Sequence, residues 1–285
     1  MRRRTKLKKD SNSSQKVLHI LILILLVVLA LLVLLPLLWL VLSAFKQEKE
    51  ILAYPPTFFP HSFTFDNFRA TAKRIKIFTY IKNSVIYAGC TTALAVFVNG
   101  MAGYAYARKR FKGKNLCFLL TLATMMVPFQ VIMVPLFLVV YKLHMYNNYL
   151  GLIIPRVAVA GSIFMMRAAF EGLPKELEDA ARIDGLSELG IYFKIMLPQV
   201  RSTVICLIIL SINGSWNDLL WPMIVASDTG MRTLSNGLAL FVGQNSIQYG
   251  ASFAGALISF MPMLLLYIFG QRYFVEGMAS SGLKG

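Results

Sequence analysis

Long apolar runs separated by short polar stretches dominate this chain of 285 residues. A helix needs about 20 apolar residues to cross a bilayer. Six segments meet that requirement, at 17–45, 81–107, 115–141, 149–170, 200–226 and 251–273. The first is almost unbroken Leu, Ile and Val, whereas the others contain Gly, Pro, Asn and Ser, as is typical of helices that pack against protein. The pattern predicts an all-α integral membrane protein with six transmembrane helices.

The composition agrees with this prediction, because 57% of the residues are hydrophobic and only 15% are charged. The first apolar run is too long for a signal-peptide core and no small-residue cleavage site ends it. It is therefore expected to be a retained anchor, which Pro36 can kink and in which His19 lies at the membrane interface.

The net charge of 29 − 13 = +16 gathers beside the apolar runs. Basic residues crowd the first 16 positions and the loop 108–114, which is how cytoplasmic membrane flanks look. Nucleic-acid binding is therefore not expected, and both termini and the loop 171–199 are expected in the cytoplasm. The loop 46–82 opposes this arrangement, because it would lie outside and yet carries more basic than acidic residues.

The sequence lacks the motifs that would support catalysis or metal binding. Gly113-Lys114 is followed by Asn115, so the phosphate-binding loop motif fails. The three histidines (19, 61 and 144) are scattered, and the three cysteines (90, 117 and 206) all lie in apolar segments. We expect no catalytic residue, no cofactor and no metal site in this chain.

The segment 171–199 is polar although it lies between two apolar runs. Acidic residues follow Pro174, as suits the first turn of a helix. Gly185 is placed to end that helix in a left-handed conformation, and Ser187 is placed to cap a second short helix. The local pattern predicts a helix–turn–helix, which on these grounds alone is either an ordinary amphipathic loop or a docking element.

The same segment carries Asp179-Ala180-Ala181, Gly185, Ile195 and Leu197-Pro198. This spacing resembles the E-A-A-x3-G-x9-I-x-L-P signature of the permeases of bacterial ABC importers, with Asp179 in place of the first Glu and Glu178 just before it. The resemblance implies a type I importer permease fold with a cytoplasmic coupling helix that docks on a separate ATP-binding subunit. The residues it implies for coupling are Glu178, Asp179, Ala180, Ala181, Arg182, Asp184 and Gly185.

Further segments look like the second permease subunit of carbohydrate importers. They are Met126-Val127-Pro128 to Pro135, Asn148 to Gly151, Trp216 to Asp218, Leu220-Trp221-Pro222, and the ending from Tyr273 to Gly285. The resemblance implies a sugar or oligosaccharide as solute, with a polyol or a phosphorylated solute such as glycerol phosphate as the alternative. It also implies a homologous permease in a heterodimer, two ATP-binding subunits and an external solute-binding protein.

A secondary transporter would instead show two similar halves and charged residues at mid-membrane, and neither is visible. The resemblance divides the chain into a tail, first helix and external loop (1–80), an importer transmembrane domain (81–273) and a cytoplasmic C-terminal tail (274–285).

Polar residues inside the apolar runs are candidates for the solute pathway. Asp218 is a carboxylate within the fifth run, and a charge there normally faces a cavity or a partner. The other candidates are Asn217, Trp216, Asn213, Asn99 and Gln130. The alternatives for Asp218 are hydrogen bonding between helices and a position near the outer membrane surface.

The orientation gives the first testable prediction. Because basic flanks place the loop 171–199 inside, a cysteine introduced as Ser187→Cys should resist an impermeant thiol reagent added to sealed cells, and should react once the membrane is opened. The unsubstituted chain measures the background from the three native cysteines. Labelling from outside at the level seen in opened cells would contradict the predicted orientation.

Overall fold

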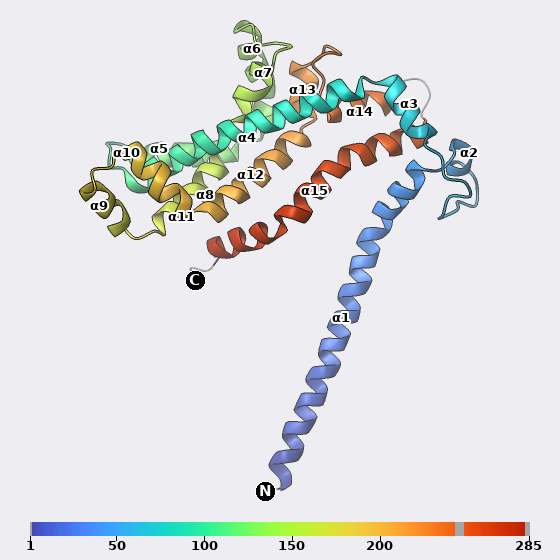
Figure 1. Cartoon of the computed structure of the whole chain (residues 1–285), viewed down its shortest axis with the longest axis horizontal. Helices are drawn as coiled ribbons and strands as arrows, with labels where there is room; N and C mark the ends of the chain where they lie inside the picture. The colour runs from blue at the N-terminus through green and yellow to red at the C-terminus, as the bar shows by residue number, and fades with distance from the viewer. Residues whose placement is uncertain (1, 243–247, 283–285) are drawn as a thin grey trace. The chain divides into compact units, whose positions relative to one another are not determined.

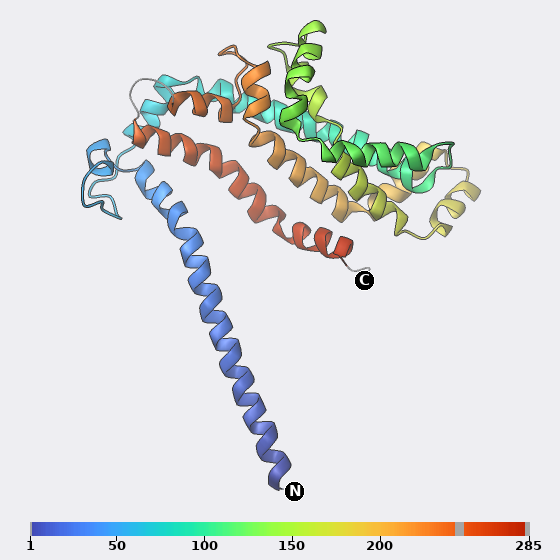
Figure 2. The same ribbon diagram turned by 180° about the vertical axis from the view of Figure 1, so that it is seen from behind.

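The computed structural model describes the backbone of residues 2–242 and 248–282, and the side chains of 15–16, 18–239 and 248–271. Every regular element in these residues is a helix, in agreement with the all-α prediction. The chain divides into two compact units, Met1–Thr71 with Ser246–Leu257, and Ala72–Asn245 with Ile258–Gly285. Figures 1 and 2 show the helices of each unit from opposite sides.

The first unit is dominated by α1 (Arg2–Ala44), whose apolar stretch Leu18–Ala44 has 27 residues. At about 1.5 Å per residue this stretch exceeds the roughly 30 Å of a bilayer core. Pro36 lies inside the helix without ending it. The side chains of this stretch are exposed along most of its length, so α1 suits contact with lipid.

A connection with two short helices follows α1, namely α2 (Glu48–Ile51) and α3 (Asp66–Arg74). Asn67 donates to the carbonyl oxygens of Ala44 at 2.9 Å and Lys46 at 2.7 Å, which satisfies acceptors that the end of α1 leaves free. Glu48 accepts from the backbone nitrogens of Tyr249 at 2.7 Å and Gly250 at 2.9 Å, at the start of α15 (Tyr249–Gly282). An acidic side chain is favourable at that positive helix end.

The second unit is built around α4 (Ile77–Arg108), which packs most extensively on α8 (Ala160–Glu171) and α12 (Arg201–Trp216). These three helices run side by side in both views (Figures 1 and 2). The approach of α4 to α8 requires glycine, because a Cβ at Gly103 would lie 2.6 Å from Met166 Cβ. Small residues that let backbones approach are the usual means of packing membrane helices.

Bends of more than 40° interrupt two of the predicted spans and mark the start of the fifth. The segments Lys114–Met126 and Phe129–Lys142 meet at 105°, Tyr149–Arg156 and Ala160–Glu171 at 48°, and Glu188–Gln199 and Arg201–Trp216 at 85°. Three described helices are long enough to span a membrane, and up to six spans result if each bent pair is one. The sharpest bend falls at Pro128, because proline holds the preceding Val127 in an extended conformation. Within these segments lie α5 (Lys114–Ala123), α6 (Phe129–Lys142) and α7 (Tyr149–Ile153).

The end of the chain differs from the sequence prediction in two places. The fifth predicted span, 200–226, is not one helix, because α12 ends at Trp216 and α13 (Leu220–Val225) follows, before α14 (Leu234–Val242). The helix α15 covers the sixth predicted span and continues to Gly282, so the segment 274–285 continues that helix within the described residues.

Candidate functional site

The predicted helix–turn–helix is present within 171–199. Its first helix, α9 (Glu176–Ile183), carries Glu176, Glu178 and Asp179 in its first turn, where their negative charges are favourable beside the positive helix end. Gly185 follows with φ of 78°, as predicted. The nitrogens of Gly185 and Leu186 donate to the carbonyls of Arg182 and Ala181, both at 3.0 Å. This pair of bonds is the Schellman motif, and it explains why a glycine is needed there.

The second part of the loop begins at Ser187, whose hydroxyl accepts from the nitrogen of Gly190 at 3.2 Å and so caps α10 (Glu188–Gly190). This confirms the predicted cap. A π-helical segment, Ile191–Met196, and α11 (Leu197–Gln199) lead into α12. Ile191, Tyr192 and Met196 are buried, so this segment anchors the loop to the helices.

The inner face of α9 corrects the expected docking surface. Glu178 and Ala181 are only 5% and 4% exposed. Ala181 packs in an apolar cluster with Phe170 and Tyr192, and the Glu178 carboxylate accepts from the Tyr104 hydroxyl at 2.6 Å. Both were expected among the coupling residues. They face the chain's own core because α9 has one side packed and one side free.

The end of α4 holds this loop through charged contacts. Arg108 Nε lies 3.6 Å from Glu178 Oε2, with both side chains 6% exposed, and Arg108 Nη2 donates to the carbonyl of Leu173 at 2.5 Å. The next residue, Lys109, pairs with Glu188. The loop is therefore fastened on both sides of α9 to one end of α4.

Arg182 organises the surface of the loop. Its Nη1 donates to Asp179 at 3.0 Å and its Nε donates to Glu188 at 3.2 Å. The hydrogen bond with Glu188 raises the pKa of the Arg182 guanidinium. Two of the expected coupling residues, Asp179 and Arg182, thus stabilise the loop while they stay exposed.

The remaining expected residues are all exposed: Ala180 lies on the outer face of α9, and Asp184 and Gly185 follow its end. The outer face also carries Ile183, which is 86% exposed and was missed by the sequence reasoning. The signal was available, since Ile183 lies one turn after Asp179 and Ala180 on the polar side of the helix. Ile183 therefore adds an exposed apolar side chain to the polar side of this helix.

The candidate pathway residues separate into buried and exposed groups. Asp218 is paired, because its Oδ2 accepts from the Tyr87 hydroxyl at 2.9 Å and lies 3.1 Å from Arg156 Nε. The Asp218 side chain is mostly buried, so the alternative of bonding between elements fits it better than contact with a solute.

Asn99 and Trp216 also have structural partners. The side chain of Asn99 donates to the carbonyl of Val157 at 3.0 Å and accepts from the nitrogen of Val159 at 3.1 Å, and so joins α4 to the start of α8. Trp216 is buried and its indole donates to the carbonyl of Ser259 at 3.0 Å. Neither side chain is available to a solute in this arrangement.

Asn213, Asn217 and Gln130 form the exposed group. The amide of Asn217 donates to the side-chain oxygen of Asn213 at 2.9 Å, which places two amides together at the end of α12. Amide side chains donate and accept hydrogen bonds without carrying charge. This pair is therefore suited to a neutral polar ligand.

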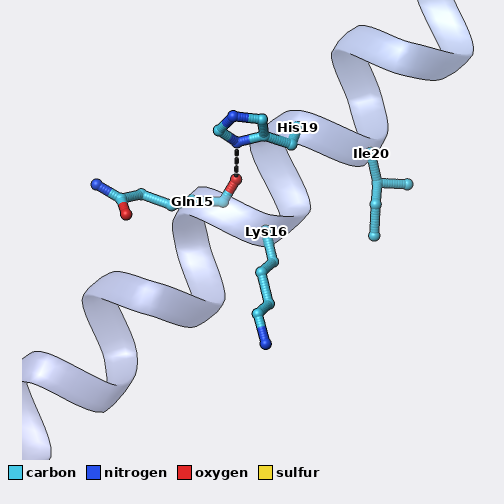
Figure 3. A pocket seen from close by; sticks show the side chains of 4 residues that line it. All are labelled: Gln15, Lys16, His19 and Ile20. Atoms are coloured by element: carbon cyan, nitrogen blue, oxygen red, sulfur yellow. Dashed lines mark hydrogen bonds between the residues drawn. The ribbon is translucent and has the colours of Figure 1, made fainter.

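A shallow surface hollow near the start of α1 is lined by Gln15, Lys16, His19 and Ile20 (Figure 3). His19 Nδ1 donates to the carbonyl oxygen of Gln15 at 2.7 Å. All four side chains come from neighbouring turns of one helix, so they do not enclose a ligand. The bond ties the ring to the helix near the end of the apolar stretch, where an interfacial residue was predicted.

Comparisons with known proteins bear on the whole chain. Residues 99–280 match the family model described as the binding-protein-dependent transport system inner membrane component. The arabinooligosaccharides transport system permease protein AraQ of Halalkalibacterium halodurans is 39% identical over 86% of this chain and 89% of its own. The sn-glycerol-3-phosphate transport system permease protein UgpE of Pectobacterium atrosepticum is 30% identical over 84% and 88%.

The fold is also similar to a solved structure. A chain from the crystal structure of a bacterial ABC transporter involved in the import of the acidic polysaccharide alginate matches with a TM-score of 0.83. The match covers 92% of this chain and 98% of the other, at 22% identity. This likeness confirms the importer-permease fold that the sequence resemblance implied.

The contact of Glu178 with α4 gives a prediction. Removing one partner of a buried ion pair costs about 3–5 kcal/mol. Glu178→Ala should therefore increase amide hydrogen exchange across 173–186 in the purified protein. The matched control is Asp179→Ala, since the exposed pair of Asp179 and Arg182 contributes about 1 kcal/mol or less. Equal exchange in the two variants would contradict a special role for the buried pair.

Proposed function

The chain belongs to the family of binding-protein-dependent transport system inner membrane components, and we propose that it forms half of the translocation pathway for a sugar or oligosaccharide. It is a membrane-embedded permease subunit of an ABC transporter, a class that works with ATP-binding and substrate-binding components. In this proposal a separate subunit hydrolyses ATP, and the permease converts the resulting motion into opening and closing of the pathway.

The complete assembly that we propose has this chain and a homologous permease as a heterodimer. Two ATP-binding subunits lie on the cytoplasmic side and a solute-binding protein on the other. Both termini and the loop 171–199 are cytoplasmic in this arrangement, because the basic flanks at the start of the chain and in 108–114 favour it. The basic loop 46–82 remains on the outer side against the statistical rule.

The coupling role is supported by one observation: the inner face of α9 is packed against the chain, whereas its outer face is free. Ile183 offers an apolar contact to an ATP-binding subunit, with Ala180 and Gly185 leaving space around it. Glu178 and Ala181, which were expected among the coupling residues, instead pack against the chain's own core. Because its inner face is fixed to the rest of the chain, a movement of α9 by a partner is transmitted to the residues that α9 contacts.

The path of that motion leads into α4. Arg108 and Tyr104 on α4 both contact Glu178, and Arg108 also bonds the segment just before α9. Because α4 packs closely on α8 and α12, its displacement would move the helices that surround it. Packed interfaces of this kind switch between discrete arrangements more readily than they deform.

The solute is proposed from chemistry and from the relatives together. The exposed candidates Asn213, Asn217 and Gln130 are neutral amides, which suit the hydroxyl groups of a sugar. Arg156, a cation that could attract a phosphate, is paired with Asp218. The more similar of the two relatives described above is named for arabinooligosaccharides. The alternative, a phosphorylated solute, has the support of the relative named for glycerol phosphate.

The coupling proposal predicts the effect of Ile183→Asp. A charge at the centre of an apolar contact is costly to bury, so the variant should lose most of the bound ATP-binding subunit and most of the solute uptake. Both are measured in the same membranes, by pull-down and by accumulation of labelled solute. The amount of permease in the membrane should stay unchanged, because Ile183 has no packing role in this chain.

The matched control is Lys112→Gln, which changes the charge by the same amount in the exposed part of the loop 108–114. It should keep both the subunit and the uptake. If Ile183→Asp retains the ATP-binding subunit and normal uptake, α9 is not the coupling element.

The solute proposal predicts the selectivity of the assembled transporter. Cells that produce all its subunits should accumulate a labelled neutral oligosaccharide, and excess glycerol 3-phosphate should not compete. The double variant Asn213→Ala and Asn217→Ala should lower this uptake several-fold at normal permease levels, through the loss of hydrogen bonds to hydroxyl groups. The single variant Asn99→Ala is the control, since it should lower the permease level instead. Uptake of glycerol 3-phosphate in place of the sugar would establish the alternative.

A further inference from the structure

The segment between α2 and α3 has an unusual composition. Residues 52–65, here called the aromatic loop, contain no Asp, Glu, Lys or Arg and are rich in aromatic residues and proline. The charged residues of this region lie before and after it. The loop belongs to the same unit as α1 and follows its C-terminal end.

The aromatic loop turns its rings outward. Its most exposed large side chains are between 62% and 97% exposed, namely Leu52, Tyr54, Phe59, Phe63 and Phe65. A loop in water would be expected to place such side chains inward. An outward-facing group of this kind marks a surface that is covered by something apolar.

Polar groups of the aromatic loop bond to side chains that precede it in the chain. Glu50 accepts from the hydroxyl of Thr57 and from the nitrogen of His61, both at 2.9 Å. Gln47 donates to the hydroxyl of Ser62 at 3.1 Å. These bonds fix the loop to the residues before it, although His61 and Ser62 are themselves exposed.

Lys46 completes this inner support. It is only 1% exposed, its ammonium donates to the carbonyl of Thr57, and it lies 4.4 Å from the centre of the Trp39 ring. A buried lysine is costly unless partners replace water, and here a carbonyl and an aromatic face do so. Lys46 is therefore satisfied within the protein while large apolar side chains of the loop face outward, and lipid contact requires that polar groups find such internal partners.

The loop is continuous with the lipid-facing surface of α1. The rings of Trp39 and Phe58 lie 5.9 Å apart, and Phe45 contacts the rings of Phe63 and Phe65 at 6.2 and 5.5 Å. From Leu18 to Leu38 the helix rises about 30 Å, which is the thickness of a bilayer core. Trp39 therefore lies where the core ends, and aromatic residues are enriched at that level.

We propose that the aromatic loop lies in the membrane interface beside the end of α1, with its exposed rings among the lipid head groups and the upper acyl chains. The occupant of this surface is the bilayer and not another protein. The loop then acts as a collar that fixes the depth and tilt of α1. This inference is independent of the transported solute and of the coupling loop, because it depends only on the insertion of α1.

Spin labels at two positions test the proposal. Phe59→Cys and Phe63→Cys are introduced separately into a chain in which the three native cysteines are replaced, and the whole transporter is placed in lipid nanodiscs with its partner subunits. Oxygen concentrates in lipid and a charged nickel chelate stays in water, so the ratio of the two relaxation effects reports the surroundings. We expect both labels to show an oxygen-to-nickel ratio several-fold above that of a label in water.

Two matched positions in the same unit set the scale. Val33→Cys lies on the exposed apolar surface of α1 and marks lipid, and Lys49→Cys lies on the exposed surface of α2 and marks water. Ratios at Phe59 and Phe63 close to that at Lys49 would overturn the proposal. Low access of both reagents would overturn it as well, because the rings would then be covered by a partner protein.

Discussion

A polar group inside a membrane protein must find its partner within the protein, because lipid offers none. This constraint accounts for the contacts that hold the described residues together. Asp218 is paired with Arg156 and Tyr87, and Asn99 uses both ends of its amide to join two elements. Each contact fixes the relative position of elements that are far apart in the sequence.

Burial within the protein imposes a similar requirement outside the membrane, because buried polar groups need hydrogen-bond partners. Residues that satisfy each other, such as Glu178 and Arg108, become part of the framework. Other residues, such as Ile183, Asn213 and Asn217, do not join separate elements and are exposed. Asn213 and Asn217 bond each other within one helix end. In the proposed mechanism the first group carries motion from α9 into α4, and the second group meets the ATP-binding subunit and the solute.

In the aromatic loop the need for polar partners also determines which side chains are left on the surface. Lys46 and Glu50 satisfy backbone and hydroxyl groups of the loop, and this leaves its rings on the outer surface. The proposed collar and the paired charges of the second unit thus follow one principle. In each case the polar groups are satisfied first, and their placement decides what kind of surface is presented outward.

The sequence predicts the helical class, the apolar segments and the local form of the segment 171–199. These features depend on nearby residues: hydropathy over about 20 positions, the left-handed turn at Gly185 and the cap at Ser187. Sequence spacing also identified the family resemblance, which the family match and the relatives confirmed.

Tertiary packing determines which side of each element is free. Ala180 and Ala181 are neighbours of the same type, yet one is exposed and the other is buried against Phe170 and Tyr192. The pairing of Asp218 with Arg156 and Tyr87 likewise joins residues that are distant in the sequence. Burial and pairing depend on both of the elements that meet. The pattern along one segment describes that segment alone and does not identify the partner against which it packs.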